Sequence, residues 1–121
     1  MVIRKVLIVD DSKTETFLMT AILQENGYSV ASAEGADQAM DKIAAERPEL
    51  ILMDVVMPGR NGFQLTRTIT RTPEFADIPI IFCTSKRLET DKVWGLRQGA
   101  RDYITKPVNA AELIAKIKAL G

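Results

Sequence analysis

Acidic, hydroxyl and amine side chains follow short apolar runs at four places in this 121-residue sequence. These places are Asp10-Asp11, Asp54, Thr84-Ser85 and Lys106-Pro107. If the three carboxylates converge they repel one another, because two charges about 4 Å apart interact by about 4 kcal/mol at an effective dielectric constant near 20. A cation must then lie among them. Oxygen ligands suit a hard cation, so we expect Mg²⁺ at this site.

The remaining polar side chains of the set fit a phosphoryl group. Lys106 supplies a second positive charge for a carboxylate or phosphoryl oxygen, and Thr84 can donate a hydrogen bond to the same oxygen. In this hypothesis Asp54 attacks phosphorus while the cations absorb the developing charge. The sequence has no histidine and a single cysteine, Cys83. Triads and zinc sites that need imidazole, and an internal disulfide, are therefore excluded.

An alternation of strands and helices can bring these residues together. We predict strands over the short apolar runs 6–9, 28–33, 50–53, 78–83 and 103–105. Segments with apolar residues at helical spacing separate these runs, and Ser12 with Glu15 has the spacing of a capping box before one of them. Strict alternation predicts an α/β fold with a parallel sheet covered by helices on both faces. Ligands of such sheets bind beyond the carboxyl ends of the strands.

One segment has a local preference that opposes this pattern. Residues 65–72 alternate with a period of two and are rich in threonine, so propensity alone favours a strand. We predict a helix instead, because Phe63, Thr66 and Ile69 share a helical face. Two parallel strands also need a crossover connection at this point in the chain.

Composition limits the classes of partner. Sixteen Lys plus Arg balance sixteen Asp plus Glu, so no global positive field exists for nucleic acid or an anionic membrane. The apolar run 6–9 is too short for a signal peptide, and no run approaches the roughly 20 apolar residues of a membrane span. We expect one cytoplasmic domain over 1–121, with no output domain, no membrane insertion and no nucleic-acid partner.

Taken together, these residues resemble the response regulator receiver domains of two-component signalling, the CheY-like family. The resemblance is carried by Asp10-Asp11, Asp54 followed by Met57-Pro58-Gly59 and Asn61-Gly62, Thr84, and Lys106-Pro107 after Tyr103. It covers the full chain and implies a single doubly wound (βα)5 flavodoxin-like domain with strand order 2-1-3-4-5. It also implies a protein that is not an enzyme toward other molecules, but catalyses its own phosphotransfer and slow autodephosphorylation.

The resemblance further implies a role for each acidic residue. Asp54 is the implied phosphoacceptor, fed by a sensor histidine kinase. Asp11, Asp54 and the backbone carbonyl of Val56 are the implied Mg²⁺ ligands, and Asp10 is the implied ligand through water.

A switch is implied as well. Thr84 would move onto the phosphoryl group while Tyr103 changes rotamer, and Lys106-Pro107 would be a cis peptide. For Tyr103, simple core packing with the hydroxyl at the surface is an equally good interpretation.

Two positions tune the lifetime of the phosphoryl group in this family, and here they hold Val56 and Lys86. Neither side chain can position an attacking water as a carboxylate or amide does, so we expect slow autodephosphorylation. Contact of Lys86 with the phosphoryl group is the alternative role for that side chain.

Basic residues gather around the predicted fourth helix, close to Trp94, Arg97 and Arg101. They form either a solvated face or, with the fifth strand and helix, the surface for a downstream protein, since Trp and Arg are favoured interface anchors. Residues 90–107 resemble the stand-alone receivers of twitching-motility and type IV pilus systems. That resemblance implies a CheA-like kinase and a monomer or weak phosphorylation-dependent dimer.

Two other functions compete with this interpretation. Haloacid-dehalogenase-type phosphatases also use an aspartyl phosphate, but they need Asp-x-Asp after the first strand, where this chain has Asp10-Asp11-Ser12. A phosphorylation-independent adaptor, or a receiver that serves as a phosphate sink, would keep the same fold. The complete acidic set argues against loss of the chemistry but leaves the phosphate sink open.

Overall fold

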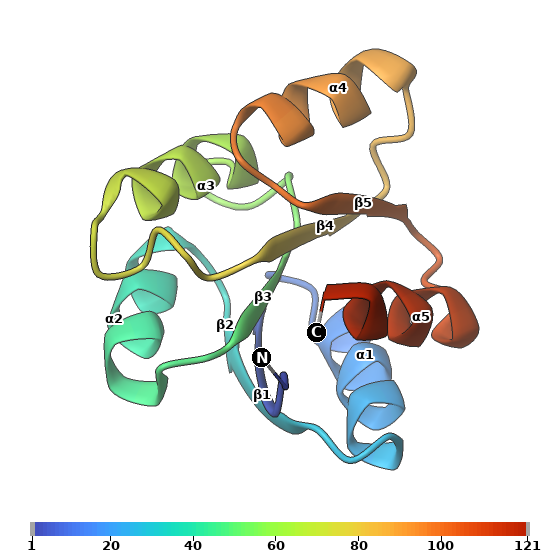
Figure 1. Cartoon of the computed structure of the whole chain (residues 1–121). Coiled ribbons are helices and arrows are strands. Elements are labelled where there is room, and N and C mark those ends of the chain that lie inside the picture. The colour runs from blue at the N-terminus through green and yellow to red at the C-terminus, as the bar shows by residue number, and fades with distance from the viewer. Residues whose placement is uncertain (1, 121) are drawn as a thin grey trace.

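The computed structural model describes residues 2–120, in which five strands alternate with five helices (Figure 1). The strands are β1 (Lys5–Val9), β2 (Ser29–Ala33), β3 (Leu50–Met53), β4 (Ile80–Thr84) and β5 (Asp102–Thr105). The helices are α1 (Lys13–Glu25), α2 (Ala36–Glu46), α3 (Gly62–Arg71), α4 (Glu89–Arg97) and α5 (Ala110–Leu120). All strands pair in parallel in the order β2-β1-β3-β4-β5, which confirms the predicted topology.

Two apolar clusters lie on opposite faces of the sheet, because the central strands are apolar on both sides. Figure 1 shows α2 and α3 on one side with α4, and α1 and α5 on the other. Leu7 and Phe82 lie in the cluster under α2 and α3, and Ile8 and Ile81 lie in the cluster under α1 and α5. The edge strand β2 is half-exposed, and its sequence Ser-Val-Ala-Ser-Ala is less apolar. None of the described helices combines the length and apolar character needed to cross a bilayer.

The segment with opposing propensity is a helix, as predicted. A capping box starts α3: the backbone N–H of Gln64 donates to Asn61 Oδ1 (2.9 Å), and the N–H of Asn61 donates to Gln64 Oε1 (3.1 Å). Its buried residues are Gly62, Leu65, Thr66 and Ile69. Burial of this face and the capping box outweigh the strand propensity of the threonines.

The fourth strand starts later than predicted and ends later. Ile78 lies outside the strand, since its N–H donates to the carbonyl of Phe75 in a turn, whereas Thr84 is the last strand residue and pairs with Thr105. Thr84 is therefore held in the sheet itself and not in the loop that follows it.

Candidate functional site

The register of the sheet places Asp10 and Asp54 side by side. Val9 of β1 pairs with Met53 of β3, so the next residues, Asp10 and Asp54, leave the sheet at the same level. The backbone N–H of Asp54 donates to the carbonyl of Val9 at 2.9 Å, which extends the ladder by one bond. Parallel pairing of two central strands thus brings together two carboxylates that are far apart in the sequence.

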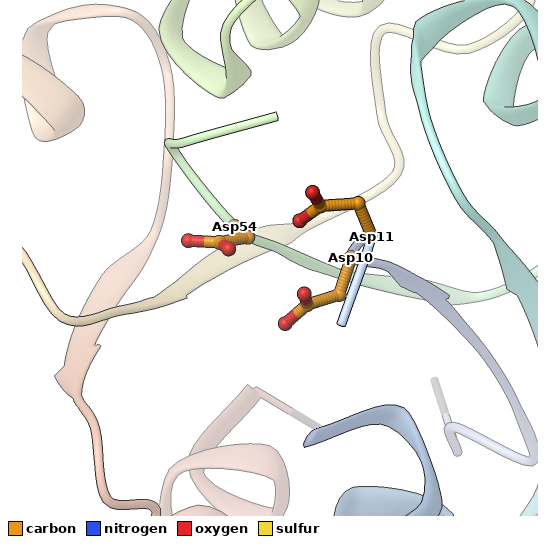
Figure 2. A group of neighbouring side chains, drawn as sticks. All are labelled: Asp10, Asp11 and Asp54. Atoms are coloured by element: carbon orange, nitrogen blue, oxygen red, sulfur yellow. The ribbon is translucent and has the colours of Figure 1, made fainter. Parts of the chain in front are cut away.

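Three carboxylates gather at this edge. One oxygen from each of Asp10, Asp11 and Asp54 lies within 4.8 Å of the others, and Figure 2 shows the three side chains projecting to the same side. Asp10 and Asp54 are buried, with 2% and 7% exposure, whereas Asp11 is exposed. A buried pair of like charges is unfavourable unless a cation neutralises it.

Lys106 supplies that cation from the end of β5. Its backbone N–H donates to the carbonyl of Thr84 at 2.8 Å, which fixes it beyond the end of β5. Its Nζ donates to Asp10 Oδ2 at 2.7 Å and lies 3.4 Å from Asp54 Oδ2, with the side chain 12% exposed. The peptide bond from Lys106 to Pro107 is cis, as the family resemblance implied.

Burial and charge act in opposite directions on this ion pair. Burial raises the pKa of Asp10, and this outweighs the lowering by hydrogen bonds from Lys106 and from the Ser12 N–H. For Lys106, burial works to lower the pKa, but the hydrogen bond to Asp10 and the charges of both carboxylates raise it. The lysine is therefore firmly protonated at neutral pH.

Sequence reasoning missed a contact at the start of α1. The expected capping box is only half formed, because Ser12 Oγ accepts the N–H of Glu15 at 3.3 Å but the Ser12 N–H is taken by Asp10 Oδ1 at 2.9 Å. Both oxygens of Asp10 thus have protein partners. An aspartate two residues before a serine is a signal for such a turn.

Gly62 was also given no role by sequence reasoning. Its N–H donates to the carbonyl of Val55 at 2.8 Å, and the N–H of Val55 donates to Asp54 Oδ1 at 2.7 Å. A Cβ at Gly62 would overlap the backbone carbonyl oxygen of Asp54. The first turn of α3 therefore packs directly on the backbone of Asp54, and only glycine allows this approach.

Both predicted switch residues contact the backbone of Lys86. Thr84 is fully buried, and its Oγ1 accepts the N–H of Lys86 at 3.3 Å. The hydroxyl of Tyr103 donates to the carbonyl of Lys86 at 2.7 Å, and burial raises the pKa of Tyr103 to about 12. Tyr103 therefore points inward. Within residues 2–120, no hydrogen bond joins Thr84 to the carboxylates.

The side chains at the two predicted tuning positions are solvent-accessible. Val56 has 55% exposure and Lys86 is exposed.

Cys83, in contrast, is 1% exposed in β4, and burial raises the pKa of its thiol to about 12. This buried, protonated thiol acts as a small apolar side chain in the core.

Trp94, Arg97 and Arg101 are all exposed. Trp94 lines a groove with residues of α3, among them Phe63 and Arg67. Trp94 therefore borders α3 as well as the solvent, and the surface that would join it to β5 and α5 stays a prediction. A helix that is only weakly buried exposes side chains to both flanks, which a linear sequence does not resolve.

The carboxylate cluster fits a hard divalent cation. All its donors are oxygens, they carry negative charge, and Asp11 is exposed with no hydrogen bond or ion pair to its carboxylate in the described chain. Both oxygens of Asp10 and both oxygens of Asp54 have protein partners, whereas among residues 2–120 the carboxylate of Asp11 has none. Asp11 is therefore the carboxylate most available for direct contact with such an ion.

Replacing Asp11 with asparagine is expected to stabilise the protein in the presence of EDTA, by about 1 kcal/mol, because it removes an unpaired charge close to two others. In millimolar MgCl₂ the order should reverse, because the wild-type chain gains binding free energy that the variant lacks. Urea unfolding under both conditions measures the difference. Asp77→Asn, in an exposed loop, serves as the control; an Asp11 variant as insensitive as this control would contradict the metal site.

Known proteins share both the sequence and the fold. Residues 6–118 match the response regulator receiver domain family. The chain is 50% identical over 116 residues to protein PilH of Pseudomonas aeruginosa, covering 96% of each chain. The crystal structure of chemotaxis protein CheY4 of Vibrio cholerae has a TM-score of 0.91 at 28% identity, covering 98% of this chain and 99% of that one.

A second solved structure is similar. The BeF3-activated N-terminal receiver domain of Klebsiella pneumoniae RstA has a TM-score of 0.88 at 30% identity, over 96% of this chain and 97% of that one. The family match spans nearly all of the sequence, and the fold and the order of strands agree with it. By sequence and by structure, this chain belongs to the response regulator receiver domain family of two-component signalling.

Proposed function

We propose that this receiver accepts a phosphoryl group on Asp54 from the phosphohistidine of a CheA-like sensor kinase, or from a small phosphodonor. The observation that carries the proposal is the pairing of three converging carboxylates with the buried ammonium group of Lys106. Like charges are gathered here although their repulsion costs stability. An arrangement of this kind is expected where the charges serve a reaction.

In the proposed step, a carboxylate oxygen of Asp54 attacks phosphorus and forms the O–P bond of an acyl phosphate. The N–P bond of the donor breaks, and its electron pair stays on the kinase imidazole; with acetyl phosphate, acetate leaves instead. A Mg²⁺ ion on Asp11, Asp54 and the carbonyl of Val56, with Asp10 through water, would neutralise charge on the phosphoryl oxygens. Lys106 holds its Nζ 3.4 Å from Asp54 and can contact one of those oxygens.

Conformational switching follows from the contacts at Lys86. The hydroxyl of Thr84 accepts the N–H of Lys86, and the carbonyl of the same residue accepts the hydroxyl of Tyr103. If Thr84 turns to donate to the phosphoryl group, its bond to the Lys86 N–H weakens and the loop before α4 is free to shift. Tyr103, bound to the same peptide segment, senses this change.

The proposed physiological role is supported by the relatives. The 50% identity to PilH supports a role in twitching motility driven by type IV pili. We further propose that the protein acts in the cytoplasm as a monomer or a weak phosphorylation-dependent dimer. A downstream protein would read the state of α4, β5 and α5, with Trp94, Arg97 and Arg101 as anchors. We propose that the chain catalyses only its own phosphotransfer and a slow autodephosphorylation.

Incubation with acetyl phosphate and Mg²⁺ tests the central step. The native chain is expected to gain one phosphate by intact mass, whereas Asp54→Asn gains none, and the control Asp77→Asn behaves like the native chain. After removal of the donor, the phosphate should decay slowly, because neither Val56 nor Lys86 positions water. Equal phosphorylation of native chain and Asp54→Asn, or no phosphorylation of either, would reject the proposal.

A further inference from the structure

A second feature lies away from the carboxylates, in a groove between α3 and α4. Its volume is about 600 Å³, within the range of small ligand sites. Its polar lining includes Arg60, Asn61, Gln64, Arg67 and Gln98, with Trp94 on the α4 side. The proposed phosphoryl transfer uses none of these side chains.

The acceptor atoms of this lining are already occupied. Asn61 Oδ1 accepts the Gln64 N–H, and Gln64 Oε1 accepts the Asn61 N–H. Gln98 Oε1 accepts from Arg67 Nε at 2.9 Å. Because an N–H donor faces each amide oxygen, the orientations of all three amides are determined. Their NH₂ groups remain as donors, so the groove offers a potential ligand donors in excess.

Positive charge in the groove is not compensated. Arg60 Nη1 donates to Thr68 Oγ1 at 3.1 Å, which holds this guanidinium against α3. Thr68 Oγ1 in turn donates to the carbonyl of Gln64, so it too is satisfied. No lining residue is acidic, and within residues 2–120 neither arginine is in an ion pair. Two positive charges thus face the same hollow in a chain whose net charge is zero.

We propose that the α3–α4 groove binds an acidic segment of a partner protein. Carboxylates of that segment pair with the guanidinium groups of Arg60 and Arg67, and accept hydrogen bonds from the free amide NH₂ groups. An apolar side chain of the segment packs on the ring of Trp94, which is 46% exposed. The groove offers only hydrogen-bond donors, so it suits a carboxylate, which has only acceptors. A nucleobase with amino groups would also need acceptor atoms from the groove.

A protein segment also fits the surroundings of the groove. On the rest of α4, Val93 and Leu96 are exposed by 43% and 47%, so the helix that borders the groove carries two further exposed apolar side chains. Exposed apolar side chains beside a charged groove favour a protein over a small anion that would fill only the hollow. Because Asp54 takes no part, the groove should bind its partner in the Asp54→Asn variant as well.

Nuclear magnetic resonance of the ¹⁵N-labelled full chain can test this proposal. The probe is an end-blocked hexapeptide of alternating glutamate and leucine; its lysine–leucine counterpart and ATP serve as comparison ligands. The glutamate peptide is expected to shift the indole N–H signal of Trp94, the only tryptophan, and the side-chain NH₂ signals of Gln98. Binding should weaken as ionic strength rises to about 0.15 M.

Variants separate the groove from general charge. Arg60→Gln and Arg67→Gln together should weaken binding of the glutamate peptide about tenfold, as expected for two exposed ion pairs. Arg60→Gln alone leaves the bond between Arg67 and Gln98 in place, so a loss of affinity in it does not come from unfolding. Arg71→Gln, on the same helix but outside the groove, is the matched control.

The proposal is overturned if the glutamate peptide shifts neither signal, if the lysine peptide shifts them equally, or if the Arg71 variant loses as much affinity as the double variant. Tighter binding of ATP than of the glutamate peptide would make this a nucleotide site and would also overturn it. Binding by Asp54→Asn at the native affinity supports it, and separates it from the phosphoryl transfer proposed above.

Discussion

Replacing Lys106 with methionine is expected to slow phosphorylation of Asp54 by acetyl phosphate about a hundredfold. The ammonium group is the only side-chain cation that the structure places on the carboxylates within residues 2–120, and it lies 3.4 Å from Asp54 Oδ2. Methionine keeps the length and apolar stem of lysine but cannot stabilise charge on the transferring group. The rate of phosphate gain by intact mass, with Mg²⁺ present, measures this effect.

The same substitution is expected to lower the free energy of unfolding at neutral pH by about 3 kcal/mol, because it leaves Asp10 and Asp54 buried without a cation. Lys116→Met is the matched control, since Lys116 pairs with Asp102 at 2.9 Å in a more exposed place, and should cost less than about 1 kcal/mol. Urea unfolding of both variants makes the comparison. Equal losses of stability would show that Lys106 contributes no more than a surface lysine.

The pH dependence of this difference follows from the two pKa shifts. The pKa of Lys106 is raised above 10.5, so its contribution is complete below pH 10.5 and is lost as pH rises through the higher, folded-state value. The pKa of Asp10 is raised above 3.8, so its carboxylate is neutralised before an ordinary aspartate as the pH falls. The native chain and the Lys106→Met variant should therefore differ most in stability at pH values between the raised pKa of Asp10 and the raised pKa of Lys106. A constant difference down to acidic pH would contradict the buried ion pair.

Gly62→Ala is expected to destabilise the protein by about 3 kcal/mol and to reduce phosphorylation of Asp54. The new Cβ would overlap the carbonyl oxygen of Asp54 and lie 2.9 Å from the Cα of Val55. All these atoms are backbone, so relief requires that the first turn of α3 move away from the end of β3. That movement would displace Asp54, the proposed phosphoacceptor, which is why both effects are expected together.

Gly35→Ala provides the control for Gly62. Gly35 precedes α2, has an extended backbone with φ of −172°, and would place its Cβ at least 4 Å from any neighbour. This variant should change stability by less than about 1 kcal/mol and leave phosphorylation unchanged. Urea unfolding and intact mass apply to both variants. A Gly62→Ala chain as stable and as readily phosphorylated as Gly35→Ala would show that the contact yields without cost.

The helix α3 shows how far local pattern carries a prediction. Threonines at alternating positions indicate a strand, yet residues 62–71 are helical, because Leu65 and Ile69 are buried together and the crossover is needed. At the fourth strand, in contrast, the apolar character of Ile78 predicts a strand residue where the structure has none. Its backbone is held in a turn to Phe75, a contact that composition does not reveal.

The sequence by itself determined the alternation of strands and helices, and with it the meeting of Asp10, Asp11, Asp54 and Lys106, because parallel strands present their carboxyl ends at one edge. Only the tertiary structure decided which contacts those residues make: Lys106 on Asp10, Gly62 on the backbone of Asp54, and Trp94 toward α3. The physical reason is the distance over which each of these influences acts. Periodicity and charge act along the chain, whereas distances of a few ångströms between segments depend on how whole helices pack on the sheet.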